Sequence, residues 1–477
     1  MNSRTGRTGR LSPRRRAARW PKALGLLAVL GMGAGAVAAW TWYADLGRTP
    51  TELLDHTEER LIGHGALQRA ARPVLDLLRE GLDAPRPAER ARNFVVPPPP
   101  PRRGVEAVPA PEPVPTGAKV WRVGPGEALT RIADAARRAR DGDVVEIVAG
   151  DYRGDVAVWS QKRLTIRGVG GAARLWADGR HAEGKGIWVI RGGDFDISNI
   201  DFIGARVGDG NGAGIRFEGG TLRVRHCLFW DNQMGLLTAG APKAADATVQ
   251  IESSEFAYSH VPGRWGHNLY VGSIASLAVT ASYFHHAGVG HLLKSRARVN
   301  DIRYNRFTDE RGGQASYELD FPNGGEVRLV GNTVQQQQGT ENGRLIAFGE
   351  EGYAWPRNTL QMASNTFVND HPHGGSFVYV APGAGLVVSA NNLRVGRGRD
   401  QITDEVLVLN DHRAEPADFQ DPAGYGYGLR DPAPGWRYQP LTGPAAAQLT
   451  PQARYRHPLR VERLAGPPQF AGAEPNP

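Results

Sequence analysis

The sequence predicts an all-β solenoid, a right-handed parallel β-helix with an N-terminal capping helix, preceded by a transmembrane helix. Three observations support this prediction. A short apolar motif recurs eight times between residues 195 and 393, the residues within each copy alternate between apolar and polar, and residues 23–43 carry no charge. Recurrence every few tens of residues is typical of stacked repeat proteins, in which each repeat forms one coil.

The repeats are anchored by apolar residues that lie 23 to 33 positions apart: Phe202, Phe229, Phe256, Phe284, Phe307, Val334, Phe367 and Leu393. Five positions earlier lies a second apolar residue: Ile197, Val224, Ile251, Val279, Ile302, Leu329, Met362 and Val388. Two positions before each of the last six anchors lies a short polar residue: Ser254, Ser282, Asn305, Asn332, Asn365 and Asn391. Alternation of period two indicates strands, and Ser or Asn favours a tight bend. We therefore expect stacked strands around one apolar column, with a ladder of Ser and Asn side chains.

The solenoid is expected over residues 119–410, followed by a Pro- and Gly-rich extension over 411–477. Near its start, residues 127–140 (EALTRIADAARRAR) place Leu129, Ile132, Ala133 and Ala136 on one face of a helix, which would cover the end of the column. Cys227 is the single cysteine, so no disulfide can form within the chain and packing must provide the stability.

The predicted helix is followed by GDVVEIVAGDYRG at residues 142–154. Together with the repeats, this passage resembles the pectate-lyase-like superfamily of right-handed parallel β-helix proteins, which includes polysaccharide lyases and epimerases. The resemblance implies an N-terminal cap and a function on polysaccharide, and it covers about residues 119–410. A lysine and an arginine on neighbouring coils also resemble the arrangement in alginate-lyase-like and chondroitinase-B-like enzymes, and only Lys294 and its immediate surroundings are carried over.

The N-terminal region predicts attachment to a membrane. Residues 1–22 contain eight Lys and Arg residues and no acid, and residues 23–43 are long enough to cross a bilayer core of ~30 Å. This pattern predicts a cytoplasmic tail, a single-pass anchor in a bacterial inner membrane, and a periplasmic solenoid. A cleaved signal segment, ending near Ala36-Val37-Ala38, is the alternative and would export the same domain. Residues 44–82 predict short amphipathic helices, and the Pro-rich residues 83–118 predict a semi-rigid linker.

The charge of the chain argues against nucleic acid as a partner. The formal net charge is +8, from 57 Lys and Arg residues against 49 Asp and Glu residues. Without the eight cations of residues 1–22, the basic residues number 49 and balance the acidic ones. A surface that binds the phosphate backbone needs an excess of positive charge, which the solenoid lacks.

Three segments on neighbouring coils carry the candidate site: residues 266–272 (GHNLYVG), 290–296 (GHLLKSR) and 316–325 (SYELDFPNGG). With Leu269, Leu293 and Leu319 pointing inward, strict alternation places the following residues outside: Asn268, Tyr270, Lys294, Arg296, Glu318 and Asp320. Strands ~4.8 Å apart would then bring Tyr270, Lys294 and Asp320 together across three coils.

This row contains the groups that β-elimination or epimerisation of a uronate requires. Such a reaction needs a cation for the substrate carboxylate, a base for the adjacent carbon-bound proton and an acid for the leaving oxygen. Lys294, with its charge suppressed by Arg296, would be the base, and Tyr270 the acid. Arg296 or Arg298 would hold the carboxylate in a two-pronged contact. Asn268, His267 and His291 would contribute to substrate binding.

Other interpretations remain open. Glu318 and Asp320 would suit a Ca²⁺ ion or the acid/base pair of a hydrolase, and no metal site is assigned. His267 and His291 favour a stacked, hydrogen-bonded pair. The row would also suit a surface ladder of ion pairs. In that case the protein would be a non-catalytic polysaccharide-binding or scaffold protein of an envelope or exopolysaccharide assembly.

Overall fold

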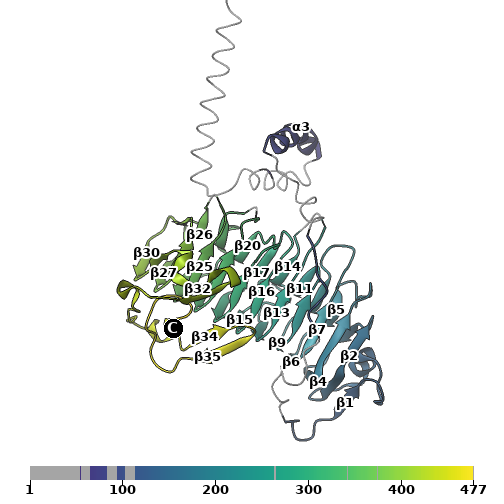
Figure 1. The fold of residues 1–477 in the computed structure, drawn as a ribbon. Helices are drawn as coiled ribbons and strands as arrows, with labels where there is room; N and C mark the ends of the chain where they lie inside the picture. The colour runs from purple at the N-terminus through teal and green to yellow at the C-terminus, as the bar shows by residue number, and fades with distance from the viewer. Residues whose placement is uncertain are drawn as a thin grey trace, which may run out of the picture. The chain divides into compact units, whose positions relative to one another are not determined.

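The computed structural model describes residues 54, 65–82, 94–101, 113–262, 265–340, 342–372 and 374–475. Its main body is a parallel β-solenoid with three columns of strands (Figure 1). The first column contains β1 (Val120–Val123), β2 (Val144–Arg153), β4 (Arg163–Trp176), β6 (Asp194–Ser198), β9 (Thr221–Arg225), β12 (Thr248–Glu252), β15 (Ser276–Thr280), β18 (Val299–Arg303), β21 (Glu326–Val330), β24 (Thr359–Ala363), β27 (Leu386–Ala390) and β30 (Val406–Leu409). All pairings within it are parallel.

The other two columns complete each coil. The second column contains β7 (Ile200–Ile203), β10 (Leu228–Trp230), β13 (Glu255–Ala257), β16 (Tyr283–His285), β19 (Arg306–Thr308), β22 (Thr333–Gln336), β25 (Thr366–Asn369), β28 (Leu393–Gly396) and β31 (His412–Ala414). The third column, called sheet B here, contains β3 (Ala157–Trp159), β5 (Gly186–Ile190), β8 (Ala213–Phe217), β11 (Met234–Thr238), β14 (His267–Val271), β17 (His291–Ser295), β20 (Tyr317–Phe321), β23 (Arg344–Phe348), β26 (Ser376–Val380) and β29 (Arg399–Ile402). The predicted all-β parallel solenoid is therefore confirmed.

The predicted anchors form the core of the column. Phe229, Phe256 and Phe284 pair in register on successive strands of the second column and are fully buried. Their rings stack at 4.4 and 4.7 Å between centroids, nearly parallel. In the first column, Ile251 pairs with Val279, and Val279 pairs with Ile302. The same position of each coil holds an apolar residue, and this residue packs on its counterpart in the next coil. The coils therefore share one continuous core.

The predicted ladder of short polar residues is also present. The Asn305 amide oxygen accepts a hydrogen bond from the Ser282 backbone N–H at 2.9 Å, and the Asn332 oxygen accepts from the Asn305 N–H at 3.0 Å. The Asn365 oxygen accepts in the same way from the Asn332 N–H at 2.9 Å. Each side chain thus satisfies a buried backbone group of the neighbouring coil, where the bend leaves it without a strand partner.

The last predicted coil is displaced by one residue. Phe367 pairs with Arg394 rather than with Leu393, and the ladder continues through Asn392 rather than Asn391. A slip of one residue exchanges the two faces of a strand. Accordingly Leu386 is exposed while Val387 is buried in the core. The prediction of Val388, Asn391 and Leu393 as repeat positions was therefore wrong.

Elements at both ends pack onto the solenoid. Helix α5 (Ile132–Arg138) lies within the predicted range 127–140, buries Ile132, Ala135 and Ala136, and contacts β1 and β3. The C-terminal extension contains β32 (Phe419–Asp421), β33 (Gly426–Leu429), α6 (Ala446–Leu449), β34 (Ala453–Arg456), β35 (Arg460–Arg463) and the 3-10 helices Pro416–Asp418, Pro422–Gly424 and Pro434–Trp436. Phe419 and Phe470 share a buried cluster with Leu393 and Val395 of β28 in the second column, and Leu449 and Ala453 share one with Tyr304 and with Val330 of β21 in the first column.

The Pro-rich segment does not act only as a spacer, because residues 94–101 lie against the solenoid. Phe94 is buried against Trp230 and Tyr258, and the Trp230 indole N–H donates to the Pro97 carbonyl at 3.0 Å. The Arg174 guanidinium donates to the Pro100 carbonyl at 3.2 Å. Residues 94–101 of the linker are thus docked on the second column and on β4.

Upstream of this segment, within the range 44–82 where short amphipathic helices were predicted, α3 (Gly65–Gly81) is one helix that continues through Pro73. Within the described ranges, no helix is both long and apolar enough to span a bilayer. The predicted basic tail and the predicted anchor, residues 1–43, lie outside those ranges.

Candidate functional site

The predicted row forms on the outer face of sheet B. Tyr270 pairs in register with Lys294, and Lys294 pairs with Asp320, on the adjacent strands β14, β17 and β20. Leu269, Leu293 and Leu319, one position earlier, are fully buried in the core. The alternation expected at these positions is therefore confirmed, and three chemically different side chains become direct neighbours.

In β14, β17, β20 and β23, the residue directly before the buried leucine or isoleucine also points inward, so the alternation of inward and outward side chains fails there. Leu292 and Leu293 of β17 are both in the core, as are Leu345 and Ile346 of β23. Two consecutive residues point inward because the chain enters these strands from a corner of the coil. Asn268 and Glu318 occupy the equivalent positions in β14 and β20, so their predicted places on the outer face were wrong.

Inside the column, the side chain of Asn268 forms hydrogen bonds, whereas that of Glu318 forms none. The Asn268 amide donates to the Phe256 and His285 carbonyls at 3.1 and 2.8 Å and accepts from the Ser259 N–H at 3.1 Å. Glu318 is fully buried, and neither of its carboxyl oxygens has a hydrogen-bond partner. Burial raises the pKa of Glu318 well above its usual range, and the nearby Asp309 carboxyl adds to this effect. Glu318 is thus a neutral interior group.

On the outer face, an ion-pair network joins three coils. The Lys294 ammonium lies 3.1 Å from Asp320 Oδ2 and 3.0 Å from Glu351 Oε1. Arg296, just beyond the end of β17, contacts both oxygens of Glu351, with Nη1 at 2.7 Å from Oε2 and Nη2 at 3.0 Å from Oε1. Arg296 also donates from Nε to the Tyr270 hydroxyl at 3.2 Å and contacts Asn323. Lys294 and Arg296 therefore converge on one carboxylate.

The protonation states differ from those expected. Burial works to lower the pKa of Lys294, but the carboxylates of Asp320 and Glu351 outweigh burial and raise it. Arg296 acts to lower the pKa of Lys294, in the predicted direction, but the two carboxylates outweigh it and Lys294 is held as an ammonium group. Burial raises the pKa of Asp320 to about 6, although Lys294 acts in the opposite direction. A carboxyl with this pKa can gain and lose a proton close to neutral pH.

His267 and His291 lie on the outer face, not toward the core, and their rings contact each other at 4.6 Å between centroids. The His291 backbone N–H donates to His267 Nδ1 at 2.9 Å, and His291 Nε2 lies 3.5 Å from Asp320 Oδ2. Burial lowers the pKa of both histidines well below its usual value, and the charge of Lys294 adds to this effect. Both rings are consequently neutral, and they border Tyr270 and Asp320.

Glu351, the carboxylate that completes the Lys294 network, and its neighbour Glu350 were not predicted from the sequence. Glu350 and Glu351 belong to the loop 349–358 that follows β23, and Glu350 accepts from the Tyr317 hydroxyl at 2.7 Å and pairs with Arg344 at 2.7 Å. The signal was the sequence GEEG directly after a strand, in the repeat with the longest spacing. Arg298, predicted to bind substrate, is exposed in the turn between β17 and β18.

The residues suggested for metal binding do not share an ion site. Glu318 and Asp320 lie on opposite faces of β20, so one Ca²⁺ ion cannot contact both carboxylates. Within the residues that the structure describes, no three His, Cys, Asp or Glu side chains are grouped for metal binding.

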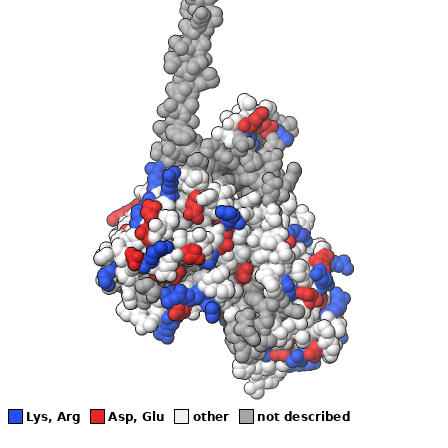
Figure 2. Space-filling model, viewed as in Figure 1, with Lys and Arg blue, Asp and Glu red and all other residues white. Residues whose placement is uncertain are grey.

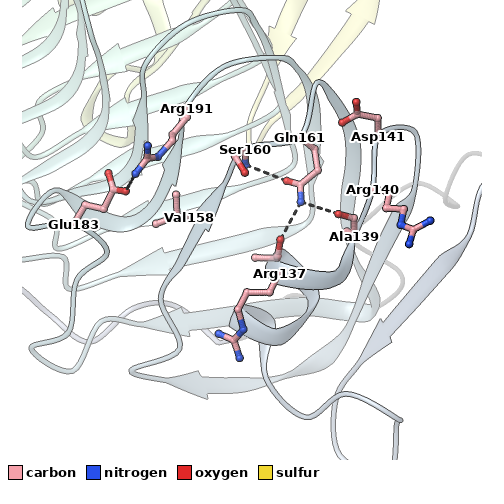
Figure 3. Close-up of a pocket in the computed structure, with 10 residues that line it drawn as sticks. Arg137, Ala139, Arg140, Asp141, Val158, Ser160, Gln161, Glu183 and Arg191 are labelled. Carbon is pink, nitrogen blue, oxygen red and sulfur yellow. Dashed lines mark hydrogen bonds and ion pairs between the residues drawn. The ribbon is translucent and has the colours of Figure 1, made fainter.

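A separate hollow of about 810 Å³ lies beside α5 (Figure 3). Its lining contains Arg137, Arg140 and Arg191, and Arg191 pairs with Glu183. Gln161 donates to the carbonyls of Ala136 and Ala139 at 2.9 and 3.0 Å, which fixes the end of the helix. None of the predicted site residues lines this hollow.

Charges on the visible face are mixed in sign (Figure 2). On the outer face of the first column, Arg223 pairs with Asp194 at 2.6 Å and Arg225 pairs with Asp196 at 2.8 Å. Exposed pairs of this kind contribute little free energy, so these rungs form a solvated ladder. The Lys294 network differs from them because Lys294 and Asp320 are largely buried.

No protein-family model and no curated protein matches the chain. Among solved structures, ORF18 of Geobacillus virus E2 is similar over 58% of this chain and 53% of its own length, with 13% sequence identity and a TM-score of 0.32. The match thus spans about half the length of that protein.

Proposed function

We propose that the outer face of sheet B binds an acidic polysaccharide and acts on it by β-elimination or epimerisation. The observation that carries the proposal is the state of Asp320. Its carboxyl is 3% exposed, its pKa is raised by burial to about 6, and it lies between the Lys294 ammonium and neutral His291. A buried group with a pKa near neutrality, surrounded by fixed charges, is typical of proton-transfer sites.

In this mechanism Asp320 takes the role that the sequence suggested for Lys294. Arg296 and Lys294 hold the uronate carboxylate, and Asp320 accepts the proton from the adjacent carbon. In elimination, the electron pair forms a carbon–carbon double bond while the leaving glycosidic oxygen takes a proton from the Tyr270 hydroxyl. In epimerisation, a proton returns to the same carbon from the opposite face. His267 and His291 supply neutral contacts beside Tyr270.

The test is turnover of a panel of uronate-containing polysaccharides by the purified chain and by Asp320→Asn. We expect wild-type protein to produce the ultraviolet absorbance of an unsaturated sugar, or to exchange the carbon-bound proton for deuterium in D₂O. Asp320→Asn should lower either rate by about 10² or more. Asp301→Asn, on the outer face of the first column, is the matched control. Equal rates for wild type and Asp320→Asn would rule out Asp320 as the base, and new reducing ends without absorbance would indicate hydrolysis.

One observation favours a non-catalytic alternative. Lys294, Arg296 and Arg344 each contact a carboxylate of the protein itself, as expected for a structural network. The chain would then bind or present polysaccharide within an envelope or exopolysaccharide assembly. Binding of acidic polysaccharide without turnover, together with co-purification of other envelope proteins, would select this function.

The wider setting belongs to the same proposal. We place the solenoid in the bacterial periplasm, tethered to the inner membrane by residues 23–43, and we assign it the right-handed winding of nearly all parallel crossovers. Helix α5 would cap its N-terminal end, as in pectate-lyase-like proteins. Recovery of the full chain in the membrane fraction, and its release by a protease that acts only from the periplasm, would support this topology. Recovery in the cytosol would contradict it.

A further inference from the structure

Glu351 lies where a ligand carboxylate would have to bind. Its two oxygens contact Nη1 and Nη2 of Arg296 at 2.7 and 3.0 Å, and the Lys294 ammonium adds a third contact at 3.0 Å. A two-pronged contact between guanidinium and carboxylate is the strongest geometry that such a pair can form. The two-pronged contact of Arg296 and one contact of Lys294, which together would suit a uronate carboxylate, are therefore already made to Glu351.

Exposure shows on which side the carboxylate lies. The Glu351 side chain is 46% exposed, whereas those of Lys294 and Arg296 are 13% and 20% exposed. Glu351 thus covers the two cations from the solvent side. A ligand that arrives from solvent meets the Glu351 carboxylate before it can contact either cation.

The loop that carries Glu351 is held independently of this contact. The Glu351 backbone N–H donates to the Pro322 carbonyl at 2.9 Å, and the Trp355 indole N–H donates to the Arg296 carbonyl at 3.2 Å. The Tyr353 hydroxyl donates to the Ala381 carbonyl at 2.5 Å. With the backbone anchored at these points, the Glu351 side chain can rotate away from the cations while the loop stays in place.

We propose that Glu351 is an internal stand-in for a substrate carboxylate, and that a uronate carboxylate displaces it from Lys294 and Arg296. This inference rests on the proposed function and adds a determinant of specificity to it. The exchange replaces one carboxylate by another, so the buried cations keep a counter-charge once the ligand is bound. A neutral polysaccharide offers no such replacement and leaves Glu351 in place. Glu351 is thereby a specificity-determining residue that selects uronate chains.

The experiment compares wild type, Glu351→Gln and the control Glu350→Gln by calorimetric titration at low temperature. Glu350 is the adjacent residue and pairs with Tyr317 and Arg344 instead. The probes are tetrasaccharides of galacturonate, guluronate and mannuronate, each with its methyl-esterified, neutral counterpart. Thermal unfolding checks that each variant is folded, and Glu351→Ala serves as a second variant.

We expect Glu351→Gln to bind at least one acidic tetrasaccharide about tenfold more tightly than wild type does, because the competing carboxylate is gone. Its methyl ester should show no gain, and Glu350→Gln should match wild type. If wild type binds an acidic tetrasaccharide and neither Glu351 variant binds it more tightly, the stand-in role is overturned while the proposed function stands. If neither wild type nor the variants bind any acidic probe, both are overturned.

Discussion

The Lys294 ammonium and the Asp320 carboxylate are in contact at 3.1 Å across two adjacent strands of sheet B. The pair is asymmetric, because Lys294 stays charged while the pKa of Asp320 is raised by burial to about 6. Asp320 can therefore gain and lose a proton near neutral pH beside a fixed positive charge. This asymmetry determines which of the two residues is suited to act as the base.

The first prediction concerns the pH dependence of turnover. A base is active in its deprotonated form, so kcat/KM on a uronate substrate should be constant above pH 6 and fall about tenfold per pH unit below it. The measurement is an initial-rate profile between pH 4 and 8. A profile that keeps falling from pH 8 downward, with no plateau above 6, would contradict the assignment of Asp320.

The second prediction concerns the interior carboxyls. Burial raises the pKa of Asp309 to about 8, and it raises the pKa of Glu318 as well. An unfolded Asp titrates near ~3.9, so between about pH 4 and 8 these carboxyls bind fewer protons in the unfolded chain than in the folded one. Their contribution to the free energy of unfolding should therefore fall as pH rises through this window, while the buried histidines, whose pKa values are lowered, act in the opposite direction below about pH 6.5.

Glu318→Gln tests this directly, because a glutamine has no charge to bury. Urea denaturation at pH 5 and at pH 8 measures the free energy of unfolding at each pH. Glu318→Gln should gain stability relative to wild type as the pH rises from 5 to 8. The control is Glu351→Gln, which removes a partly exposed carboxylate. The difference in free energy of unfolding between pH 5 and pH 8 should be nearly the same in this variant as in wild type. If the free energy of unfolding changes by the same amount between pH 5 and pH 8 in wild type and in Glu318→Gln, Glu318 is ionised in the folded protein.

The third prediction concerns the ladder. The Asn332 side chain accepts from Asn305 and donates to the Ile302 carbonyl at 2.8 Å and to Asn365 at 3.1 Å, all in the interior. Asn332→Ala removes these bonds and leaves buried groups unpaired, so we expect a loss of about 3 kcal/mol in the free energy of unfolding. The exposed Gln250→Ala on β12 should change it by less than about 0.5 kcal/mol. Similar losses in the two variants would argue against the ladder.

The fourth prediction concerns the docked segment 94–101. Phe94 is 8% exposed and packs on Tyr258 and Trp230, so Phe94→Ala should release the segment and uncover the Trp230 indole. Oxidative footprinting read by mass spectrometry should then show faster modification of Trp230 while the overall melting temperature changes little. Val95, which is 78% exposed, provides the control Val95→Ala. Unchanged footprints in Phe94→Ala would show that Phe94 does not hold the segment.

The repeats were predictable because each coil repeats the same physical requirement. A residue of one coil packs on its counterpart in the next, so Phe256 and Phe284 could be paired from their spacing alone. The same register placed Tyr270, Lys294 and Asp320 side by side. Seven of the eight predicted anchors pair as expected.

The last coil and the corners of the coils were not predictable in this way. Val387 and Val388 are both apolar and Asn391 and Asn392 are both Asn, so a shift of one residue leaves the pattern intact. The contacts of Asn392 with Asn365 decide the register. At the corners, alternation of period two does not hold, which is why Glu318 points into the core.

From the amino-acid order alone come the coil, the register of every predicted coil but the last and the three-residue row, because these depend on contacts that recur at a regular spacing. The assembled molecule decided the rest: Asp320 is the titrating group, Glu351 covers the two cations, and residues 94–101 are docked on the second column. These features arise from burial and from contacts of loops that occur at one place in the chain and are not repeated from coil to coil. A pattern in the sequence carries no information about such single contacts, since only the folded chain brings their partners within reach.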